Sequence, residues 1–428
     1  MKNKILKIAV TGTKGKTTTA NLIAQVLQKY DFSRVLLVDT TGHFVNGERR
    51  STLADSKNTW GLVPSVAPGR YLYEFMGRED EEKNVAVMET SLGCSTLSGM
   101  GFAMHHVGIF LNIFEDHIGS SKRINSKEDI VEAKKFIISR ILRDGFAVLN
   151  ADDKYVMSVV DDVATHRKVF PIFIGLDLMA ANLPNDHQTA AFLTLREGYI
   201  VHIYKDIETR IVEVSKLVWT FEGVYEPSVY NALAVCAGII GLYGGCVPKD
   251  LGVRLAETRL GEYGGRLTRF SNENGVEIIA DYAHEKKSLV EIARLAHKIK
   301  SPNGKVYGIL RLAYDRTDEL ITDTGETIAS EFDYVVVYDK IDGHLRQPKK
   351  NLQFDRFTQE TGKTSQTFYD AVSSKNTNSV RIIREDEAIA HVAKIAQAGD
   401  VVVSIVNDDV VQSVTFIKEA FNAQMLEK

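Results

Sequence analysis

Continuous apolar runs, each followed by a turn or by polar residues, recur through the first 150 positions of the chain. A short unbroken apolar run is typical of a strand that is buried on both faces, as in a parallel sheet. Five such runs predict strands at 5–10, 35–39, 85–88, 107–111 and 146–149. Apolar residues at helical spacing predict helices at 19–27, 126–142 and 228–242. Alternating apolar and polar positions over 191–218 predict an antiparallel hairpin region.

The alternation of strands and helices starts again after a glycine-rich run, residues 261–265. Strands are predicted there at 276–280, 305–310, 333–338, 379–383 and 401–405, and helices at 286–299, 319–330, 366–373, 385–397 and 411–422. This pattern predicts an α/β protein with two doubly wound sheets. The expected domains are 1–262 and a smaller, Rossmann-like one over 263–428. Residues 40–80 are irregular, which predicts a lid or loop insertion, or a subunit contact.

The turn between the first strand and the first helix reads T-G-T-K-G-K-T-T, from Thr11 to Thr18. Such a strand–turn–helix segment binds phosphate, because backbone N–H groups converge on the anion and the helix dipole favours its charge. Gly12 and Gly15 leave room for the phosphate. Lys16 would reach the terminal phosphates, and the Thr17 hydroxyl would hold Mg²⁺. The alternative is a tight turn that merely uses glycine. The spacing is shorter than the common G-x-x-x-x-G-K-[ST], because Val10 stands where the first glycine belongs. The strand before the turn and the helix after it favour a P-loop nucleotide site in the first domain.

Polar clusters follow two later strands of the same predicted sheet. Glu89-Thr90-Ser91 ends the third strand, and Asn112 with Glu115-Asp116-His117 follows the fourth. In open parallel sheets, ligands bind outside the carboxyl ends of the strands. Both clusters are therefore expected at the same edge as the P-loop.

Lys134 occupies an unusual position in the predicted helix 126–142. It lies on the apolar stripe, one turn from Ile130 and one turn from Ile138. A lysine in that place either extends its ammonium group to solvent or is held inside for a reason. The residues alone favour the first of these two interpretations.

Composition sets limits on partners and location. The formal net charge of −4 gives no reason to expect nucleic acid or an anionic membrane as a partner. No apolar run approaches the length that spans a bilayer, and residues 1–4 lead into the first strand without a signal-peptide pattern. The three cysteines lack any C-x-x-C spacing, so neither a zinc ribbon nor a disulfide framework is indicated. We therefore expect a cytoplasmic protein.

Further short motifs accompany the P-loop and the two strand-end clusters in a fixed order. They are Glu132-Ala133-Lys134, Asn150-Ala151-Asp152-Asp153, Asn231-Ala232-Leu233-Ala234, Gly265-Arg266 and Asp281-Tyr282-Ala283-His284. This order resembles the Mur ligases, a family of ATP-dependent amide ligases, over nearly the whole chain. The likeness is greatest to the carboxyl-terminal half of cyanophycin synthetase. The resemblance implies the family's ATPase and amino-acid domains, without a UDP-sugar-binding domain or an ATP-grasp half.

The resemblance also implies roles for individual residues in binding ATP and Mg²⁺. Thr17 and Glu89 would hold the Mg²⁺ that bridges the terminal phosphates. His117 and Lys134, the latter carbamylated, would hold a second Mg²⁺. The nucleotide would contact the P-loop, other residues of the first domain and the start of the second: Gly12, Thr13, Lys14, Gly15, Lys16, Thr17, Thr18, Asn112, Asn231, Arg266, Asp281 and His284.

The catalytic residues implied by the resemblance are Lys16, His117, Lys134 and Arg266, and the incoming amino acid would contact Arg311, Asp315 and Arg316. Three positions depart from the family pattern. Ser228 and Glu285 each stand where asparagine is usual, and Tyr314 stands where glycine is usual, so the identity of the amino acid does not carry over.

Three functions are compatible with these residues. The first is an ATP-dependent ligase that activates a small-molecule or peptide carboxylate as an acyl phosphate and joins it to an amino acid or another amine. The second keeps this activation but takes ammonia from a glutaminase partner. The third is a nucleotide-binding scaffold or switch without ligation chemistry. The residues do not reveal the acceptor, the amine, whether a product is polymerised, or whether the chain forms a homodimer.

Overall fold

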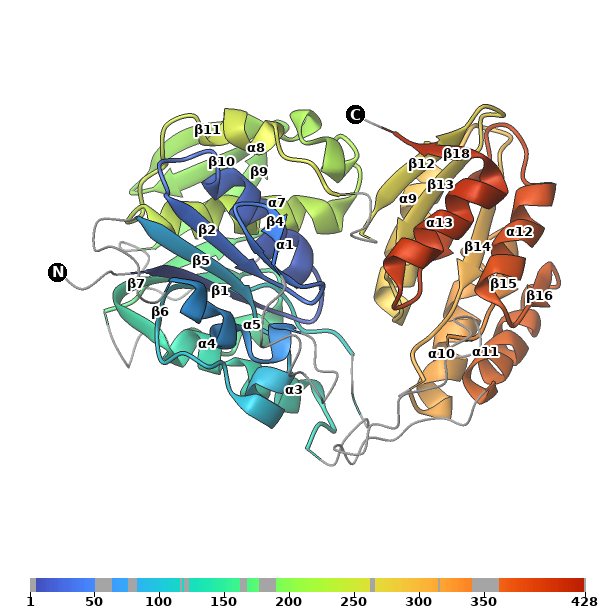
Figure 1. Cartoon of the computed structure of the whole chain (residues 1–428), viewed down its shortest axis with the longest axis horizontal. Helices are drawn as coiled ribbons and strands as arrows, with labels where there is room; N and C mark the ends of the chain where they lie inside the picture. The colour runs from blue at the N-terminus through green and yellow to red at the C-terminus, as the bar shows by residue number, and fades with distance from the viewer. Residues whose placement is uncertain are drawn as a thin grey trace. The chain divides into compact units, whose positions relative to one another are not determined.

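A computed structural model describes residues 5–50, 64–75, 83–115, 118, 123–161, 168–176, 190–261, 266–314, 316–340 and 362–426. The chain divides into two compact units. The first unit comprises Met1–Phe114 and Lys127–Arg259, and the second comprises Glu115–Ser126 and Leu260–Lys428. Each unit contains its own mixed sheet, so the predicted α/β class with two sheets is confirmed (Figure 1).

The first unit is built on an 11-stranded sheet with the order β11-β10-β9-β8-β7-β6-β1-β5-β2-β3-β4. Its parallel part runs from β2 to β9: β1 (Leu6–Thr11), β2 (Arg34–Val38), β5 (Asn84–Glu89), β6 (His105–Phe110), β7 (Ile141–Asn150), β8 (Phe170–Ile174) and β9 (Ala191–Arg196). Antiparallel strands extend it at both sides: β3 (His43–Val45), β4 (Glu48–Arg49), β10 (Tyr199–Tyr204) and β11 (Ile207–Glu213).

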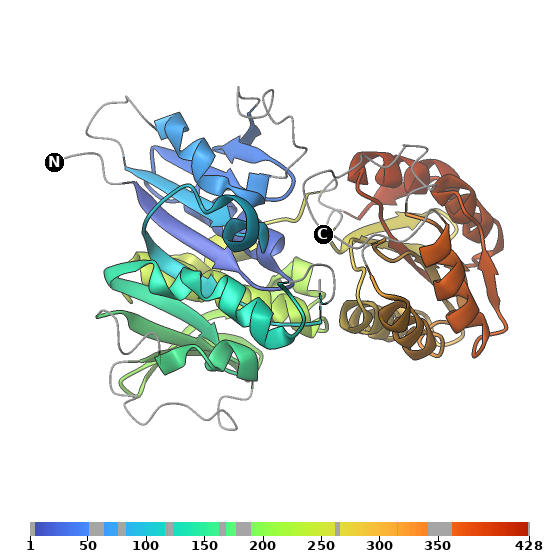
Figure 2. The same cartoon turned by 90° about the horizontal axis from the view of Figure 1, so that it is seen from below.

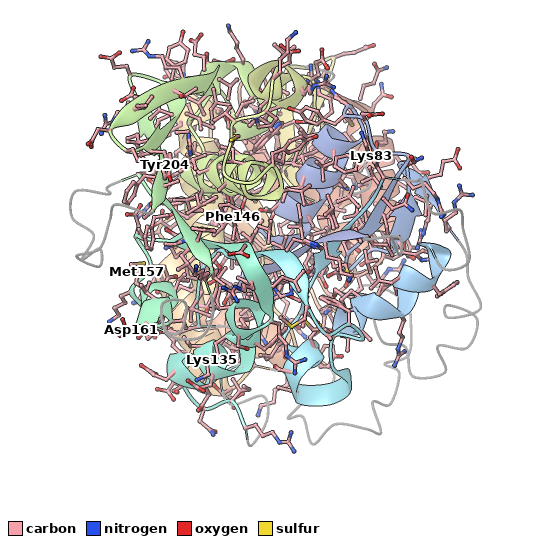
Figure 3. All side chains as sticks on the ribbon, turned by 90° about the vertical axis from the view of Figure 1, so that its left-hand side faces the viewer. Lys83, Lys135, Phe146, Met157, Asp161 and Tyr204 are labelled. Atoms are coloured by element: carbon pink, nitrogen blue, oxygen red, sulfur yellow. The ribbon has the colours of Figure 1, made fainter. Side chains whose placement is uncertain are left out.

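Helices cover both faces of this sheet (Figure 1). One face packs against α1 (Lys16–Leu27) and α7 (Glu226–Leu242), and the other against α4 (Phe136–Ser139) and α5 (Lys154–Met157), with α3 (Lys127–Lys134) beside them. Helix α8 (Leu251–Ala256) contacts β11 and α1. Helix α7 packs closely against Phe146 of β7, which is labelled in Figure 3. A Cβ on Gly241 of α7 would lie 2.9 Å from Phe146 Cβ, so glycine permits this approach.

The structure corrects the predicted helix at 126–142. Helix α3 ends at Lys134, α4 ends at Ser139, and Ile141 already pairs with His105 as the first residue of β7. The apolar residues at 137, 138 and 141 suit either structure, so spacing could not locate the change. Gly145 permits the strand, because a Cβ there would lie 2.5 Å from the carbonyl oxygen of His106.

Residues 40–80 contain more regular structure than their irregular pattern predicted. Strands β3 and β4 form a hairpin whose turn, Asn46–Gly47, has positive φ at both residues, as a tight hairpin turn requires. Two 3₁₀ segments follow, η1 (Pro64–Val66) and η2 (Pro68–Phe75). The predicted insertion otherwise lies outside the described residues.

The second unit contains a 7-stranded sheet with the order β16-β15-β14-β17-β13-β12-β18. Its parallel strands are β13 (Glu277–Asp281), β14 (Val306–Leu310), β15 (Tyr334–Val337), β16 (Ser379–Arg381) and β17 (Val401–Ile405). Two antiparallel strands, which the apolar pattern did not indicate, complete one side: β12 (Thr268–Asn272) and β18 (Ala423–Met425).

Within the described part of this unit, five helices connect these strands, close to the ranges predicted: α9 (Lys286–Ile299), α10 (Asp318–Ile328), α11 (Lys363–Ser373), α12 (Glu385–Ile395) and α13 (Val410–Phe421). Figure 2 shows α12 and α13, in red, on one side of the sheet and α9, in tan, on the other. Among the described residues, no helix is long and apolar enough to cross a membrane.

Candidate functional site

The P-loop of the first unit forms where β1 ends and α1 begins. Gly12 (φ 147°) and Gly15 (φ 81°) adopt conformations that residues with a Cβ rarely take. Gly15 precedes the first residue of α1, and no side chain caps that helix. The first turn of α1 contains no acidic residue. Its backbone N–H groups and helix dipole therefore favour an anion, and the binding of phosphate there stays a prediction.

Asn112, which follows β6, holds the P-loop backbone. Its side-chain oxygen accepts hydrogen bonds from the backbone N–H groups of Thr13 (3.1 Å) and Lys14 (2.8 Å), and its amide nitrogen donates to Lys14 O (3.1 Å). Lys16 Nζ donates to Thr13 O at 2.8 Å. These bonds fix the shape of the loop, whereas a direct contact of Asn112 with nucleotide stays a prediction.

Asn231 of α7 lies against the same loop. A Cβ added at Gly15 would lie 2.4 Å from Asn231 Oδ1, so the loop approaches this side chain through a glycine. Asn231 Oδ1 also accepts a hydrogen bond from Thr19 Oγ1 of α1 at 3.4 Å. The predicted residues Asn112 and Asn231 therefore support the P-loop from two different elements.

Glu89 ends β5 beside the P-loop threonine. Its side chain is buried, with 2% exposed. Thr17 Oγ1 donates to Glu89 Oε2 at 2.9 Å. Because the hydroxyl proton points to the carboxylate, the lone pairs of the Thr17 oxygen remain available to a cation. A hydroxyl and a carboxylate oxygen are hard ligands that suit Mg²⁺, so this pair fits the predicted metal.

Asp39, the residue after β2, adds a second buried carboxyl group near Glu89. Burial and, to a smaller extent, the charge of Glu89 raise its pKa to about 6, although hydrogen bonds from Thr41 and Gly42 oppose the increase. Asp39 Oδ1 accepts hydrogen bonds from the backbone N–H groups of Thr41 (2.7 Å) and Gly42 (3.1 Å). This edge of the sheet thus concentrates negative charge that a divalent cation would neutralise.

Lys134 is not extended to solvent, which corrects the interpretation favoured by the residues alone. It is only 4% exposed, and its Nζ lies 3.5 Å from the hydroxyl of Thr11 at the end of β1. Burial raises the pKa of the Cys94 thiol to about 12, although the nearby charge of Lys134 opposes the increase. Helix α3 therefore directs this lysine inward, toward the edge that carries the P-loop. The expected second-metal partner, His117, lies outside the described residues.

In the second unit, hydrogen bonds fix the backbone around the motif 281–284, which begins at the last residue of β13. Asp281 accepts hydrogen bonds from the backbone N–H groups of Leu267 (2.9 Å) and Ala283 (2.7 Å). His284 Nδ1 lies 2.7 Å from the carbonyl oxygen of Tyr282. Arg266 lies over the Tyr282 ring, with its guanidinium carbon 4.7 Å from the ring centroid. The predicted residues Arg266, Asp281 and His284 are thus brought together at the start of the second unit.

Glu285, one of the departures from the family pattern, caps a helix of the second unit. It is the N-cap of α9, and its carboxylate accepts hydrogen bonds from the backbone N–H groups of Lys287 (2.9 Å) and Ser288 (2.8 Å). The carboxylate therefore occupies a helix end that would otherwise favour an anion.

The three residues predicted to contact the incoming amino acid follow β14. Arg311 is 0% exposed, and its Nε (3.2 Å) and Nη2 (2.6 Å) donate to the carbonyl oxygen of Val406 after β17. Arg316 is also buried, and Asp315 lies outside the described residues. Arg311 is therefore buried inside the second unit, where it bonds the backbone. Its contact with substrate stays a prediction.

Residues that no motif singled out complete both groups. Thr40 donates to Glu89 from its backbone N–H (3.0 Å) and its hydroxyl (2.8 Å). In the second unit, Tyr282 donates its hydroxyl proton to Asp408, which Lys340 also contacts at 3.0 Å. Thr40, Lys340 and Asp408 could have been suspected, because they follow the carboxyl ends of β2, β15 and β17. Nothing in their sequence context distinguishes them from ordinary loop residues.

Together, the fold and the loop define a P-loop nucleotide-binding protein. Comparison with known families is more specific: the Mur ligase middle domain matches residues 10–237, and the Mur ligase glutamate ligase domain matches residues 265–405. The first match alone covers more than half of the 428 residues. The chain belongs to the Mur ligase family of ATP-dependent amide ligases, which confirms the resemblance seen in the motifs.

Known sequences place the chain among two kinds of relative. It is 27% identical over 401 residues to cyanophycin synthetase of Crocosphaera subtropica, covering 92% of this chain but 42% of that protein. It is 24% identical over 408 residues to UDP-N-acetylmuramoyl-L-alanyl-D-glutamate–2,6-diaminopimelate ligase of Bacteroides thetaiotaomicron, covering 92% of this chain and 72% of that protein. The chain therefore spans less than half the length of the cyanophycin synthetase.

Solved structures show the same fold. Escherichia coli FolC, in complex with DHPP and ADP, has a TM-score of 0.65 at 15% identity and covers 98% of this chain and 90% of its own. MurF ligase from Thermotoga maritima, in complex with ADP, has a TM-score of 0.59 at 17% identity and covers 98% of this chain and 79% of its own.

Proposed function

We propose that this protein is an ATP-dependent ligase that forms an amide bond between a carboxylate acceptor and an amino acid or another amine. The observation that carries the proposal is the Thr17–Glu89 pair beside a P-loop whose helix has no side-chain cap, because it joins a phosphate site to a pair of hard metal ligands. Family membership supports the same conclusion, as do the names of the relatives. The cofactors would be ATP and Mg²⁺.

The reaction would proceed in two steps. The acceptor carboxylate attacks the γ-phosphorus of ATP, an acyl phosphate forms, and ADP leaves. The amine then attacks the acyl carbon and loses a proton, and phosphate leaves as the amide bond forms. Negative charge develops on the phosphoryl oxygens in the first step, so positioned cations and N–H groups are the main catalytic means.

Residues of the first unit would bind and orient the phosphates. The N–H groups at the start of α1 would bind them, and Lys16 would move from Thr13 O to a terminal phosphate. Thr17 and Glu89 would hold Mg²⁺, which would supply positive charge to the phosphates when bound. Arg266, Asp281 and His284 are proposed to contact the nucleotide, and Arg311, Asp315 and Arg316 the amino acid.

Lys134 is proposed to act as a carbamate. The ammonium group first loses a proton, and reaction of the neutral amine with CO₂ then forms an N–C bond and releases a second proton. A buried cation thus becomes an anion. That anion, with His117, would hold a second Mg²⁺. The inward position of Lys134, 4% exposed and directed to the end of β1, supports this proposal.

Phosphate release from Mg-ATP by the purified protein tests the proposed function. It is measured against single amino acids and ammonium, each with and without short acidic peptides or amino-acid carboxylates. The Lys16→Ala variant is the blank, and loss of its cation should lower any stimulated rate by about 100-fold or more. Release that requires one acceptor and one amine together supports a ligase, and a requirement for ammonium favours glutaminase coupling. ATP binding with no stimulated release would favour a scaffold or switch.

A further inference from the structure

The carboxylate of Glu89 accepts hydrogen bonds from Thr40 as well as from Thr17 of the P-loop. Thr40, two residues after the end of β2, donates to Glu89 Oε2 from its backbone N–H at 3.0 Å and to Oε1 from its hydroxyl at 2.8 Å. With Thr17 on Oε2, both oxygens of the carboxylate are bonded, and the bonds come from two different elements. A buried carboxylate bonded at both oxygens has one orientation.

The bonds extend one residue further, to Ser65 of η1. The hydroxyl oxygens of Thr40 and Ser65 lie 3.1 Å apart, and Ser65 is 0% exposed. An ionised carboxylate only accepts hydrogen bonds, so the single hydroxyl proton of Thr40 points to Glu89. Ser65 must then donate to Thr40, which gives the chain one direction: Ser65 to Thr40 to Glu89.

Ser65 is itself fixed to the segment that follows β5. Its carbonyl oxygen accepts hydrogen bonds from the backbone N–H of Ser91 (3.0 Å), the hydroxyl of Ser91 (3.2 Å) and the thiol of Cys94 (3.1 Å). Ser65, the first donor in this series of hydrogen bonds, is therefore fixed in position. The same bonds attach η1 to the edge of the sheet that carries Glu89.

We infer that Thr40 and Ser65 are positioning residues for the metal-binding carboxylate, an inference that rests on the proposed role of Glu89. Their hydroxyl groups hold Glu89 in the orientation in which Oε2 receives the Thr17 proton. The Thr17 lone pairs and the carboxylate are thus presented together before a cation binds. Loss of a hydrogen bond that orients a metal ligand typically lowers metal affinity 10- to 100-fold.

Binding of Mn²⁺ in the presence of ADP, measured by electron paramagnetic resonance, tests this inference without requiring turnover. Thr40→Val keeps the size of the side chain and removes the hydroxyl, and should weaken Mn²⁺ binding about 10-fold. Ser65→Ala should weaken it in the same direction by a smaller factor. Thr40→Ser should restore wild-type binding. Binding of ADP without metal should be the same in all of these variants.

Thr96→Val is the matched control, because its hydroxyl donates to the carbonyl oxygen of Leu92 at 3.1 Å and not to Glu89 or Thr40. It should bind Mn²⁺ as the wild type does. Glu89→Gln separates the inference from the proposed function. Unchanged Mn²⁺ binding in Glu89→Gln would overturn the metal role of Glu89.

A loss in Glu89→Gln with no change in Thr40→Val or Ser65→Ala would overturn the positioning role alone. The double variant Thr40→Val/Glu89→Gln should bind no more weakly than Glu89→Gln, because Thr40 acts through that carboxylate. Ser65→Ala leaves Thr40 intact, so it provides the same test if Thr40→Val does not fold.

Discussion

The ammonium group of Lys134 and the hydroxyl of Thr11 are 3.5 Å apart, although 123 residues separate them in the chain. Thr11 Oγ1 donates its proton to the carbonyl oxygen of Thr90 at 3.2 Å, so it can accept from the lysine. Thr11 is the last residue of β1, and Thr90 follows the last residue of the adjacent strand β5. Helix α3 therefore presents Lys134 to the sheet edge that contains the P-loop and Glu89.

Replacement of Lys134 by alanine should abolish stimulated phosphate release, since the proposed carbamate would be lost. Formate or acetate, added at millimolar concentration, should restore part of the rate by supplying a carboxylate in the space left by the side chain. Full activity of Lys134→Ala without any additive would contradict the proposal. Lys135→Ala is the matched control, because Lys135 pairs at the surface with Glu132 at 2.8 Å and should tolerate the change.

Gly15→Ala should impair nucleotide binding for a reason that Asn231 makes testable. The new Cβ would lie 2.4 Å from Asn231 Oδ1, and φ is 81°, so both contact and backbone strain are expected. Together they should destabilise the folded protein by about 1–3 kcal/mol. Asn231→Ala removes the contact and should recover part of this loss when combined with Gly15→Ala. Urea denaturation and ADP titration of the two single variants and the double variant measure the coupling, and strictly additive effects would refute the contact.

Tyr282 should act on Arg266 through its ring. The ring lies 4.7 Å from the Arg266 guanidinium and 4.6 Å from that of Arg311. Tyr282→Leu removes the aromatic face and should lower kcat of the stimulated reaction about tenfold, whereas Tyr282→Phe should retain most of the rate. In an Arg266→Ala background, Tyr282→Leu should lower kcat by a smaller factor, because only the ring contact with Arg311 is then lost. An equal loss in both backgrounds would show that Tyr282 acts elsewhere.

Glu385 should make the stability of the second unit depend on pH. Burial raises its pKa to about 7, although a hydrogen bond from Ser413 and the charge of Arg311 oppose the increase. Ser413 Oγ donates to Glu385 Oε1 at 2.6 Å. Because the folded protein holds this proton more tightly than the unfolded chain, the stabilisation is complete below about pH 4.5 and is lost as pH rises through 7.

The size of this effect follows from the shift in pKa. Loss of the proton should cost about 3 kcal/mol at most between pH 5 and 8. Glu385→Gln cannot ionise, so its free energy of unfolding should fall less steeply over this range than that of the wild type. Urea denaturation at several pH values, followed by circular dichroism, gives both curves. Parallel curves for the two proteins would contradict the raised pKa.

The sequence by itself determined the local parts of this protein. The P-loop could be identified because strand, glycine turn and helix follow one another within Leu6–Leu27, so their chemistry depends on neighbouring residues only. Glu89 and Asn112 could be assigned to the same edge, since parallel strands present their carboxyl ends together. The two doubly wound sheets followed from the alternation of buried strands and amphipathic helices.

Only the tertiary structure decided which distant groups meet. Spacing cannot tell whether a lysine on an apolar stripe reaches solvent, because that depends on the elements packed above it, and Lys134 is buried against β1. Thr40 and Ser65 have no distinctive neighbours in the sequence, yet their hydroxyl groups meet at Glu89. Their role arises from side-chain hydrogen bonds across 25 and 49 residues, which form only when the sheet brings the ends of β2 and β5 together.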